Sequence, residues 1–354
     1  MEFALTEEQT ELAATMRSLL GKRADSTAVR VAADSDIGHD PELWRLLCEQ
    51  IGVAALAVPE EYDGVGCSAF ETLVVLEELG RSLAPSPLLT GLITSETLLA
   101  SEDADACTRL LPRLAAGAIA TTAWSGPRGP GRQEPVRAEG SALSGTVTDV
   151  LFGDVAEVLL VAARTDTGVA LFEVDPALVT RTYTPAMDTT QRLATLTFEN
   201  TPATLVVADA TAALARAHLV GTVACAALQV GCAERALEMT VAYSKERVQF
   251  GRQIGSFQAL KHRMADMLVL VEMSRSAFWA AAHALSVASP DAERLAAVAG
   301  SYCSDSLTRI ASETVQLHGG IAITWEHDAQ LVFKRSHALA QLFGQAHVHR
   351  RQLL

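Results

Sequence analysis

The C-terminal part of the chain constrains the fold most, because it contains long apolar stretches in series, each with helical periodicity. The predicted helices cover 211–245, 256–287, 291–317 and 328–350. Four long helices in series predict an up-down bundle. Each helix is apolar over most of its surface, which is more than one bundle core can bury. We therefore expect bundles to pack on one another in an oligomer.

Before the bundle, the sequence has two segments with different hydrophobic periodicity, 1–118 and 119–208. Residues 1–118 predict helices, beginning with a capping box in which Thr6 precedes Gln9 by three positions. Between 119 and 208 short β-rich runs follow one another, namely ATTAW, VLLVAAR, GVALFEVD and RLATLTFEN. The stretch Ser125–Gly140 is rich in Gly, Pro and Arg and is predicted to be a long loop.

These patterns together predict a mostly helical α+β fold with three domains. They are an N-terminal helical domain (1–118), a small antiparallel β domain in the middle (119–208) and a C-terminal four-helix bundle (209–354).

The charge balance excludes some classes of partner. The chain has 42 acidic and 28 basic side chains and a formal net charge of -14, which argues against binding to nucleic acid or to an anionic membrane. No apolar run is long enough to span a bilayer, and the N-terminus lacks the features of a secretion signal. The six cysteines are scattered without a CxxC pair, so we expect reduced cysteines, no metal site and a cytoplasmic location.

The stretch from Arg247 to Met267, RVQFGRQIGSFQALKHRMADM, combines groups that suit a ligand. Arg247 offers a fixed cation, Phe250 a flat apolar ring, and Gly251 a backbone position that tolerates close approach. Together these residues can hold a phosphate and an aromatic ring system at a helix entrance. A helix-loop-helix corner with a surface arginine explains the same pattern, and local chemistry leaves both interpretations open.

Three separated segments, in the same order, resemble the acyl-CoA dehydrogenase family, and the resemblance covers essentially the whole chain. The first is GVAALAVPEEYDGVGCSAFETLVVLEELGR, similar to the family's N-terminal loop and the helix that follows it. The second is YSKERVQFGRQIGSFQALKHRMADM, which resembles a flavin-contacting segment. The third is QLHGGIAITWEHDAQLVFKRS, which resembles a second glycine motif.

The resemblance implies the α,β-dehydrogenation of an acyl-CoA thioester with FAD as cofactor. A carboxylate base would take the α proton while a hydride leaves the β carbon for the flavin. The thioester oxygen must be polarised, and the carboxylate must be desolvated so that its basicity rises. The activity thus needs a base, an oxyanion site and a cradle for the flavin ring.

The base implied by the family is missing here. The usual glutamate position falls in the stretch QLFGQ, at Phe343. A minority of members carry the glutamate on the long preceding helix, and the corresponding position lies near Gly221. The stretch LVGTVACAALQVGCA around it contains no Asp or Glu. We interpret Glu326 as a solvated or capping carboxylate, since it matches a position outside the family's catalytic pair.

The family's flavin-ring cradle also looks eroded. A Thr-Glu-Pro stretch followed by Gly-Ser-Asp is expected in the β domain. This chain has Trp124-Ser125-Gly126-Pro127 and then RGPGRQEP. A tryptophan-led strand that normally backs the ring is replaced by the stretch from Val150 to Gly153, VLFG.

The other half of the family's flavin site is retained. In the family one subunit holds the flavin ring, while a neighbouring subunit holds the pyrophosphate and adenine end. The resemblance assigns the second role to two segments, of the types Arg-x-x-Phe-Gly and Gln-x-x-Gly-Gly. The predicted cofactor-binding residues are Arg247, Phe250, Gly251, Gln258, Gln316, Leu317, Gly319 and Gly320.

These features predict an accessory subunit of a heteromeric, heterotetrameric (α2β2) acyl-CoA dehydrogenase, without a catalytic base of its own. Its implied partners are a second, base-bearing subunit, an acyl-CoA substrate with a bulky side chain such as a steroid one, and an electron-transfer flavoprotein as acceptor. Two alternatives stay open. One is a free-standing homo-oligomeric flavoenzyme with an unrecognised base. The other is a non-enzymatic structural or acyl-CoA-binding relative.

Overall fold

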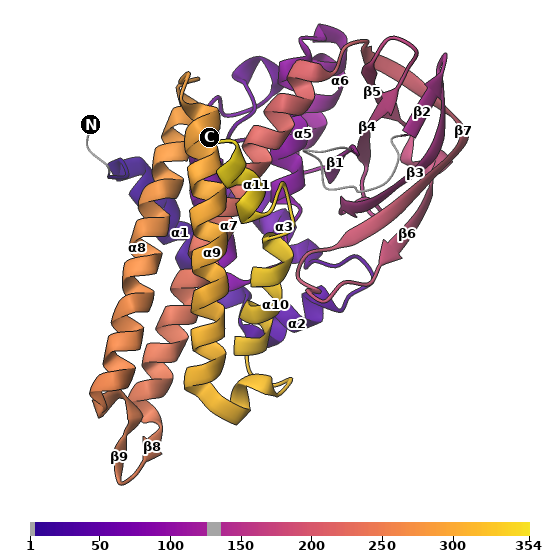
Figure 1. The fold of residues 1–354 in the computed structure, drawn as a ribbon. Coiled ribbons are helices and arrows are strands. Elements are labelled where there is room, and N and C mark those ends of the chain that lie inside the picture. The colour runs from indigo at the N-terminus through magenta and orange to yellow at the C-terminus, as the bar shows by residue number, and fades with distance from the viewer. Residues whose placement is uncertain (1–3, 126–135) are drawn as a thin grey trace.

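The computed structural model describes residues 4–125 and 136–354. Helices from the first and last parts of the chain pack together, and the strands of the middle part form a sheet beside them (Figure 1). The mostly helical α+β fold predicted from the sequence is therefore confirmed. The first strand begins at Ala120 and the last strand of the sheet ends at Val207. The domain boundaries at 118 and 208 stay a prediction.

The N-terminal part is helical from residue 7 onward. Its helices are α1 (Glu7–Arg23), α2 (Ser26–Ala33), α3 (Pro41–Leu46), α4 (Ala69–Ser82), α5 (Leu88–Ser101) and α6 (Ala104–Ala115). The capping box is confirmed, because the Thr6 hydroxyl accepts from the Gln9 backbone while the Gln9 side chain accepts from the Thr6 backbone. A π-helical turn (η1, Leu47–Ile51) extends α3, and a 3-10 turn (η2, Glu60–Tyr62) lies in the loop before α4.

The middle part forms a seven-stranded sheet. Its strands are β1 (Ala120–Ala123), β2 (Val136–Glu139), β3 (Ala142–Leu151), β4 (Val158–Arg164), β5 (Val169–Val174), β6 (Thr180–Thr184) and β7 (Leu193–Val207). The predicted antiparallel pairing holds for five of the strand pairs in this sheet, but β4 is parallel to both β1 and β2. Neither strand is joined to β4 by a hairpin, and strands linked by a longer connection are free to pair in parallel.

The predicted loop Ser125–Gly140 is wrong at its C-terminal end, where β2 begins at Val136. Within β2 only Val136 is buried, while Arg137 and Glu139 are exposed. Four residues with two outward charges give too weak an alternation to predict a strand. Residues 126–135 of the predicted loop lie outside the described part of the chain.

The C-terminal helices follow the predicted series except at its end. They are α7 (Thr211–Glu246), α8 (Gln258–Ser286), α9 (Ala292–His318), α10 (Ala329–Leu339) and α11 (Ala346–Arg351). The prediction of one helix over 328–350 is wrong, because Phe343 and Gly344 adopt φ values of 54° and 116° that an α-helix does not allow. The break separates α10 from α11 at the position where the family carries its glutamate.

Helix α7 occupies the centre of the helical part, where it packs against α4, α5, α8, α9 and α10. Within the described residues it is the one helix that is long and apolar enough to cross a membrane, by length and composition alone. Of its most apolar window, 61% is buried inside the protein. The core helix of a soluble protein passes the same test.

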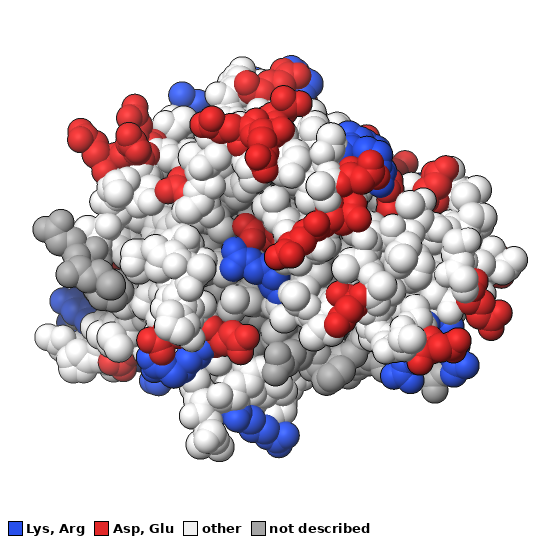
Figure 2. Space-filling model, turned by 90° about the horizontal axis from the view of Figure 1, so that it is seen from above, with Lys and Arg blue, Asp and Glu red and all other residues white. Residues whose placement is uncertain are grey.

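The surface reflects the acidic composition. Seen from above, Asp and Glu side chains are spread over the molecule and exceed Lys and Arg on that face (Figure 2). Such a face lacks the basic patch that a nucleic-acid partner requires.

Two glycines allow α4 and α7 to touch backbone to backbone. A Cβ on Gly231 of α7 would lie 1.8 Å from the backbone oxygen of Glu77 in α4. A Cβ on Gly80 of α4 would lie 2.4 Å from the backbone oxygen of Leu228. Because backbone atoms cannot rotate away as side chains do, this crossing tolerates no side chain.

We expect Gly231→Ala to lower the free energy of unfolding by roughly 2–3 kcal/mol, because the added methyl group forces α4 and α7 apart. Chemical denaturation followed by circular dichroism measures the change. Gly91→Ala in α5 is the matched control, since a Cβ there meets nothing within 4 Å. That variant should be as stable as the parent or more stable by about 0.5–1 kcal/mol. A Gly231→Ala protein as stable as the parent would contradict the close crossing.

Candidate functional site

A short β-hairpin, with two residues in each strand and two in the turn, extends from the end of the helical bundle (Figure 1). It consists of β8 (Val248–Gln249) and β9 (Arg252–Gln253), with Phe250 and Gly251 at the turn. Both turn residues have positive φ, 52° and 78°, as in a type I′ turn. Phe250 is 92% exposed. The turn therefore exposes the ring of Phe250 to solvent. It also holds the backbone of Phe250 in a conformation that phenylalanine disfavours.

A groove of about 580 Å³ lies beside this hairpin, between the C-terminal ends of α7 and α9 and the N-terminal end of α8. Of the predicted cofactor-binding residues, Arg247, Phe250, Gln316, Leu317, Gly319 and Gly320 line it. Gly251 and Gln258 do not line the groove: Gly251 is the exposed second turn residue, and Gln258 is the first residue of α8. The two separated sequence segments therefore meet in one place.

Several further residues of the groove were not predicted from the sequence. They are Tyr243, Gln249, Ile254, Phe257, Ala259, Leu260, Arg263 and His318. Phe257 and Leu260 stand at helical spacing with Met264 and Met267, a pattern that predicts only the apolar face of a helix. His318 stands between two predicted residues and carried no separate pattern.

The groove is suited to an anion. Its walls contain two arginines and, within the described residues, no Asp or Glu. Arg263 forms an ion pair with Glu313, whereas Arg247 forms none with any described residue. Helix α8 begins at the groove with no side-chain cap among the described residues, so backbone N–H groups of its first turn are available. An unpaired guanidinium beside a free helix N-terminus favours a phosphate.

Aromatic rings form the floor of the groove. The ring of His318 stacks on Tyr243 with centroids 4.5 Å apart and lies 4.6 Å from the ring of His327. Its Nδ1 donates to the backbone oxygen of Thr314 at 2.8 Å. Burial lowers the pKa of His318, and the neighbouring His327 lowers it further, although the bond to Thr314 opposes this shift. The floor is therefore flat and neutral near pH 7.

The lowered pKa of His318 predicts a loss of stability in acid. Below about pH 6.5 the unfolded chain takes up the proton before the folded chain does, so the free energy of unfolding falls as the pH decreases. Above about pH 6.5 the contribution is fully present. Denaturant titrations at several pH values should show a shallower acid loss for His318→Gln than for the parent. His262→Gln, at an exposed position of α8, is the control and should retain the parental slope.

The two base positions of the family lie against each other in the interior. A Cβ on Gly221 of α7 would lie 2.5 Å from the ring of Phe343. Phe343 is 2% exposed, and the ring of Trp124 lies 6.0 Å from it. The structure therefore brings both positions to one point, and a phenylalanine ring fills the space between them.

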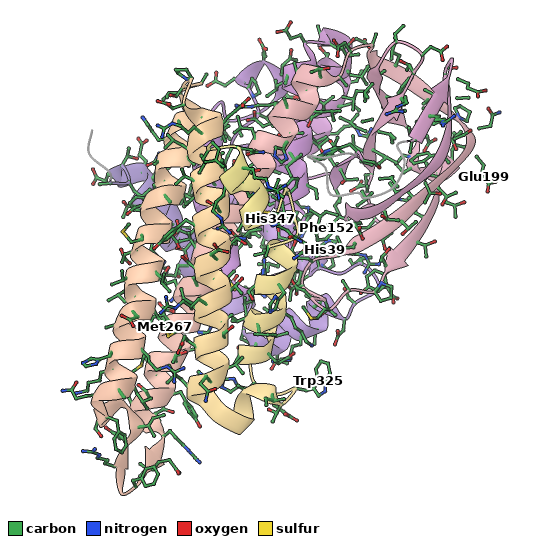
Figure 3. All side chains as sticks on the ribbon, in the orientation of Figure 1. His39, Phe152, Glu199, Met267, Trp325 and His347 are labelled. Carbon is green, nitrogen blue, oxygen red and sulfur yellow. The ribbon has the colours of Figure 1, made fainter. Side chains whose placement is uncertain are left out.

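The β-sheet side of this point is filled by apolar side chains as well. Val150, Leu151 and Phe152 are buried, and the edge of Phe152 meets the ring of His39 (Figure 3). Trp124, Leu151, Phe152 and Phe343 belong to the same hydrophobic core as the middle of α7. Among the described residues, close-packed hydrocarbon therefore occupies this side of the interior.

An apolar cavity of about 690 Å³ adjoins this region, between α10 and the segment that precedes β7. Leu342 and Asp188 are among its lining residues. One oxygen of Asp188 accepts from the backbone and hydroxyl of Thr190, and the other has no hydrogen-bond partner within the described residues. Burial raises the pKa of Asp188, although Arg335 opposes the shift. No sequence pattern pointed to this carboxyl group.

Comparison with known proteins identifies the fold and the segments described above. Residues 6–118 match the model of the acyl-CoA dehydrogenase N-terminal domain, and residues 191–354 match that of the C-terminal domain. The chain belongs to the acyl-CoA dehydrogenase family. The predicted family and its helix–sheet–helix architecture are thus confirmed, and members of this family are FAD-binding oxidoreductases.

Individual relatives within the acyl-CoA dehydrogenases cover almost the whole chain. The acyl-CoA dehydrogenase IpdE2 of Mycolicibacterium smegmatis is 43% identical, over 96% of both sequences. A chain of the ChsE4-ChsE5 complex from Mycobacterium tuberculosis superposes with a TM-score of 0.90 at 28% identity, covering 100% of this chain and 98% of that one. A Tcur3481-Tcur3483 steroid ACAD variant superposes with a TM-score of 0.88 at 30% identity, covering 98% and 96%.

Two regions of the chain compare differently with the needs of an acyl-CoA dehydrogenase. We call them half-sites: the groove at Arg247, and the interior at Gly221 and Phe343. At the bundle end it offers a guanidinium, aromatic rings and glycines around an open groove. In the interior it has Phe343 and Gly221 at the two positions where the resemblance implies a base, and neither side chain can accept a proton.

Proposed function

We propose that the chain is the accessory subunit of a heteromeric, FAD-dependent acyl-CoA dehydrogenase. Its groove binds the adenine and diphosphate end of a flavin whose ring is seated in a second, base-bearing subunit. The observation that carries this proposal is the contrast between the open, cationic groove at Arg247 and the filled interior at Phe343. The partner would supply the carboxylate that takes the α proton, and the flavin held between the two chains would supply the hydride acceptor.

The distance between the half-sites supports sharing. Gly221 lies within α7, and Arg247 follows its last residue, 26 residues further along the chain. At a rise of 1.5 Å per residue this separation corresponds to about 39 Å. Roughly fifteen single bonds join the flavin ring to adenine, and these span on the order of 20 Å when extended. One flavin cannot occupy both half-sites of the same chain, so the ring that belongs to this groove must come from another subunit.

Exposed apolar side chains next to the groove also support a partner. Ile321, Ile323 and Trp325 follow directly after the two glycines of the groove, and Ile323 and Trp325 are 77% and 74% exposed. Figure 3 shows Trp325 pointing away from the body of the protein. Such residues are typical of interface anchors. Two similar solved structures are named as two-component complexes, ChsE4-ChsE5 and Tcur3481-Tcur3483.

The remaining parts of the proposal follow from the relatives and the family. The complex is an α2β2 heterotetramer in the cytoplasm, it acts on an acyl-CoA with a bulky, steroid-type side chain, and it passes electrons to an electron-transfer flavoprotein. The steroid class is supported by the name of the Tcur3481-Tcur3483 relative.

Co-expression tests the proposal. The chain is purified alone and together with a base-bearing acyl-CoA dehydrogenase from the same genome, and flavin absorbance and dehydrogenase activity are measured in both samples. We expect colour and activity only from the co-expressed pair. Stoichiometric FAD bound by the chain alone, with dehydrogenase activity, would overturn the accessory role.

Arg247→Ala should release FAD from the complex, because it removes the unpaired cation of the groove. The loss of a charge-assisted contact to phosphate predicts about tenfold or weaker FAD binding. Flavin occupancy of the purified complex measures this loss, and circular dichroism checks that the fold is unchanged. Arg45→Ala on α3, whose side chain is exposed and pairs with Glu49, should keep full occupancy. Unchanged occupancy in Arg247→Ala would refute the assignment of Arg247.

One observation favours the alternative of a free-standing flavoenzyme, namely the buried Asp188 with its raised pKa beside the apolar cavity. A desolvated carboxylate in a cavity is the type of group that acts as a general base. If the chain alone turns over acyl-CoA, Asp188→Asn should abolish that activity. In the accessory role the same variant leaves the turnover of the complex intact, provided that the complex assembles.

A further inference from the structure

Arg252 lies at the rim of the groove although no sequence pattern selected it. It pairs with Gln249 across the hairpin, and directly opposed residues present their side chains on the same face. Gln249 lines the groove. The guanidinium of Arg252 lies 4.0 Å from the centroid of Phe257, which also lines the groove. Phe257 in turn meets the exposed Phe250 edge to face at 6.2 Å. Stacking therefore orders Arg252 before any ligand arrives.

Arg263 lies in the groove itself, but its charge is already compensated. Its Nε and Nη2 both contact one carboxylate oxygen of Glu313, Oε2. The two side chains are half-buried. A phosphate would therefore have to displace Glu313 before it could use Arg263.

We infer that Arg247 and Arg252 form a two-arginine clamp for the diphosphate, and that Glu313 withholds Arg263 from it. This inference rests on the proposed function and names the residues that set its charge. A diphosphate diester such as that of FAD carries two negative charges. Arg247 and Arg252 supply two positive charges that no described carboxylate neutralises, whereas Arg263 and Glu313 cancel each other. Arg252 is thus a positioning residue for the cofactor.

Titration of the full chain with ADP at low salt tests the inference, since ADP carries the adenine and diphosphate and the groove belongs to this chain alone. Saturation-transfer NMR detects even weak binding. We expect Arg252→Ala to weaken ADP binding about tenfold, as the loss of one charged hydrogen-bond donor predicts. Arg252→Lys should recover part of the loss, because it restores the charge without the two-point geometry. Arg252→Ala should also reduce the salt dependence of binding, whereas Arg252→Lys should retain it because the charge is kept.

The Arg263–Glu313 pair provides the matched controls. The double variant Arg263→Ala/Glu313→Ala removes both charges of the pair and should bind ADP as the parent does. Glu313→Gln should bind it several-fold more tightly and with a steeper salt dependence, because Arg263 becomes available. The outcomes separate two failures. If the parent chain does not bind ADP, or Arg247→Ala binds it equally well, the proposed function falls and the clamp with it. If Arg247→Ala loses binding while Arg252→Ala does not, or the double variant Arg263→Ala/Glu313→Ala weakens binding as much as Arg252→Ala, the clamp alone is overturned.

Discussion

The burial of α7 is the constraint on which the rest of the structure depends. Its backbone touches that of α4 through Gly231 and Gly80, so the N-terminal helices and the bundle form one packed unit. A helix enclosed by α4, α5, α8, α9 and α10 is fixed in position and cannot bend toward a ligand. The two half-sites, at Gly221 and at the end of the helix, are therefore held at a set distance.

Because α7 is rigid, the interior half-site can be filled by side chains while the groove half-site stays open. In the interior, the ring of Phe343 fills the space beside Gly221, and its centroid lies 6.0 Å from that of the Trp124 ring. Reopening that space would require the removal of large buried side chains, each of which contributes roughly 3–5 kcal/mol to stability. The groove at the bundle end is formed by helix ends and a hairpin outside the core, so its shape does not depend on what fills the interior.

Helices and strands were predicted well from the sequence where local signals agree. Contacts between segments that are distant in the sequence were predicted poorly. The Thr6 capping box follows from local chemistry, and the start of α7 at Thr211 agrees with the helical periodicity of the sequence. The apolar surface of α7 was interpreted as a sign of oligomers, but α4 and α5 of the N-terminal part cover much of it. Helix α8 still exposes Leu268, Val269 and Met273.

The candidate site shows the same division. The segments around Arg247 and Gln316 were predicted because each carries a recognisable pattern, and they line one groove. The contact between Gly221 and Phe343 depends on the break after α10, which requires a phenylalanine in the left-handed region, and no local rule predicts that conformation. The roles of Arg252 and Arg263 depend on partners, Phe257 and Glu313, that only the folded chain brings near.

The hairpin itself argues that the isolated chain is incomplete. A phenylalanine with positive φ costs on the order of 1 kcal/mol, and Phe250 recovers little of it in this chain because its ring is almost fully exposed. The unpaired Arg247 and the uncapped start of α8 leave further polar groups without partners in the described structure. An adenine ring, a diphosphate and the surface of a second subunit would together satisfy each of these groups. The unsatisfied groups at this end of the bundle are therefore explained by a ligand and a partner subunit that bind there.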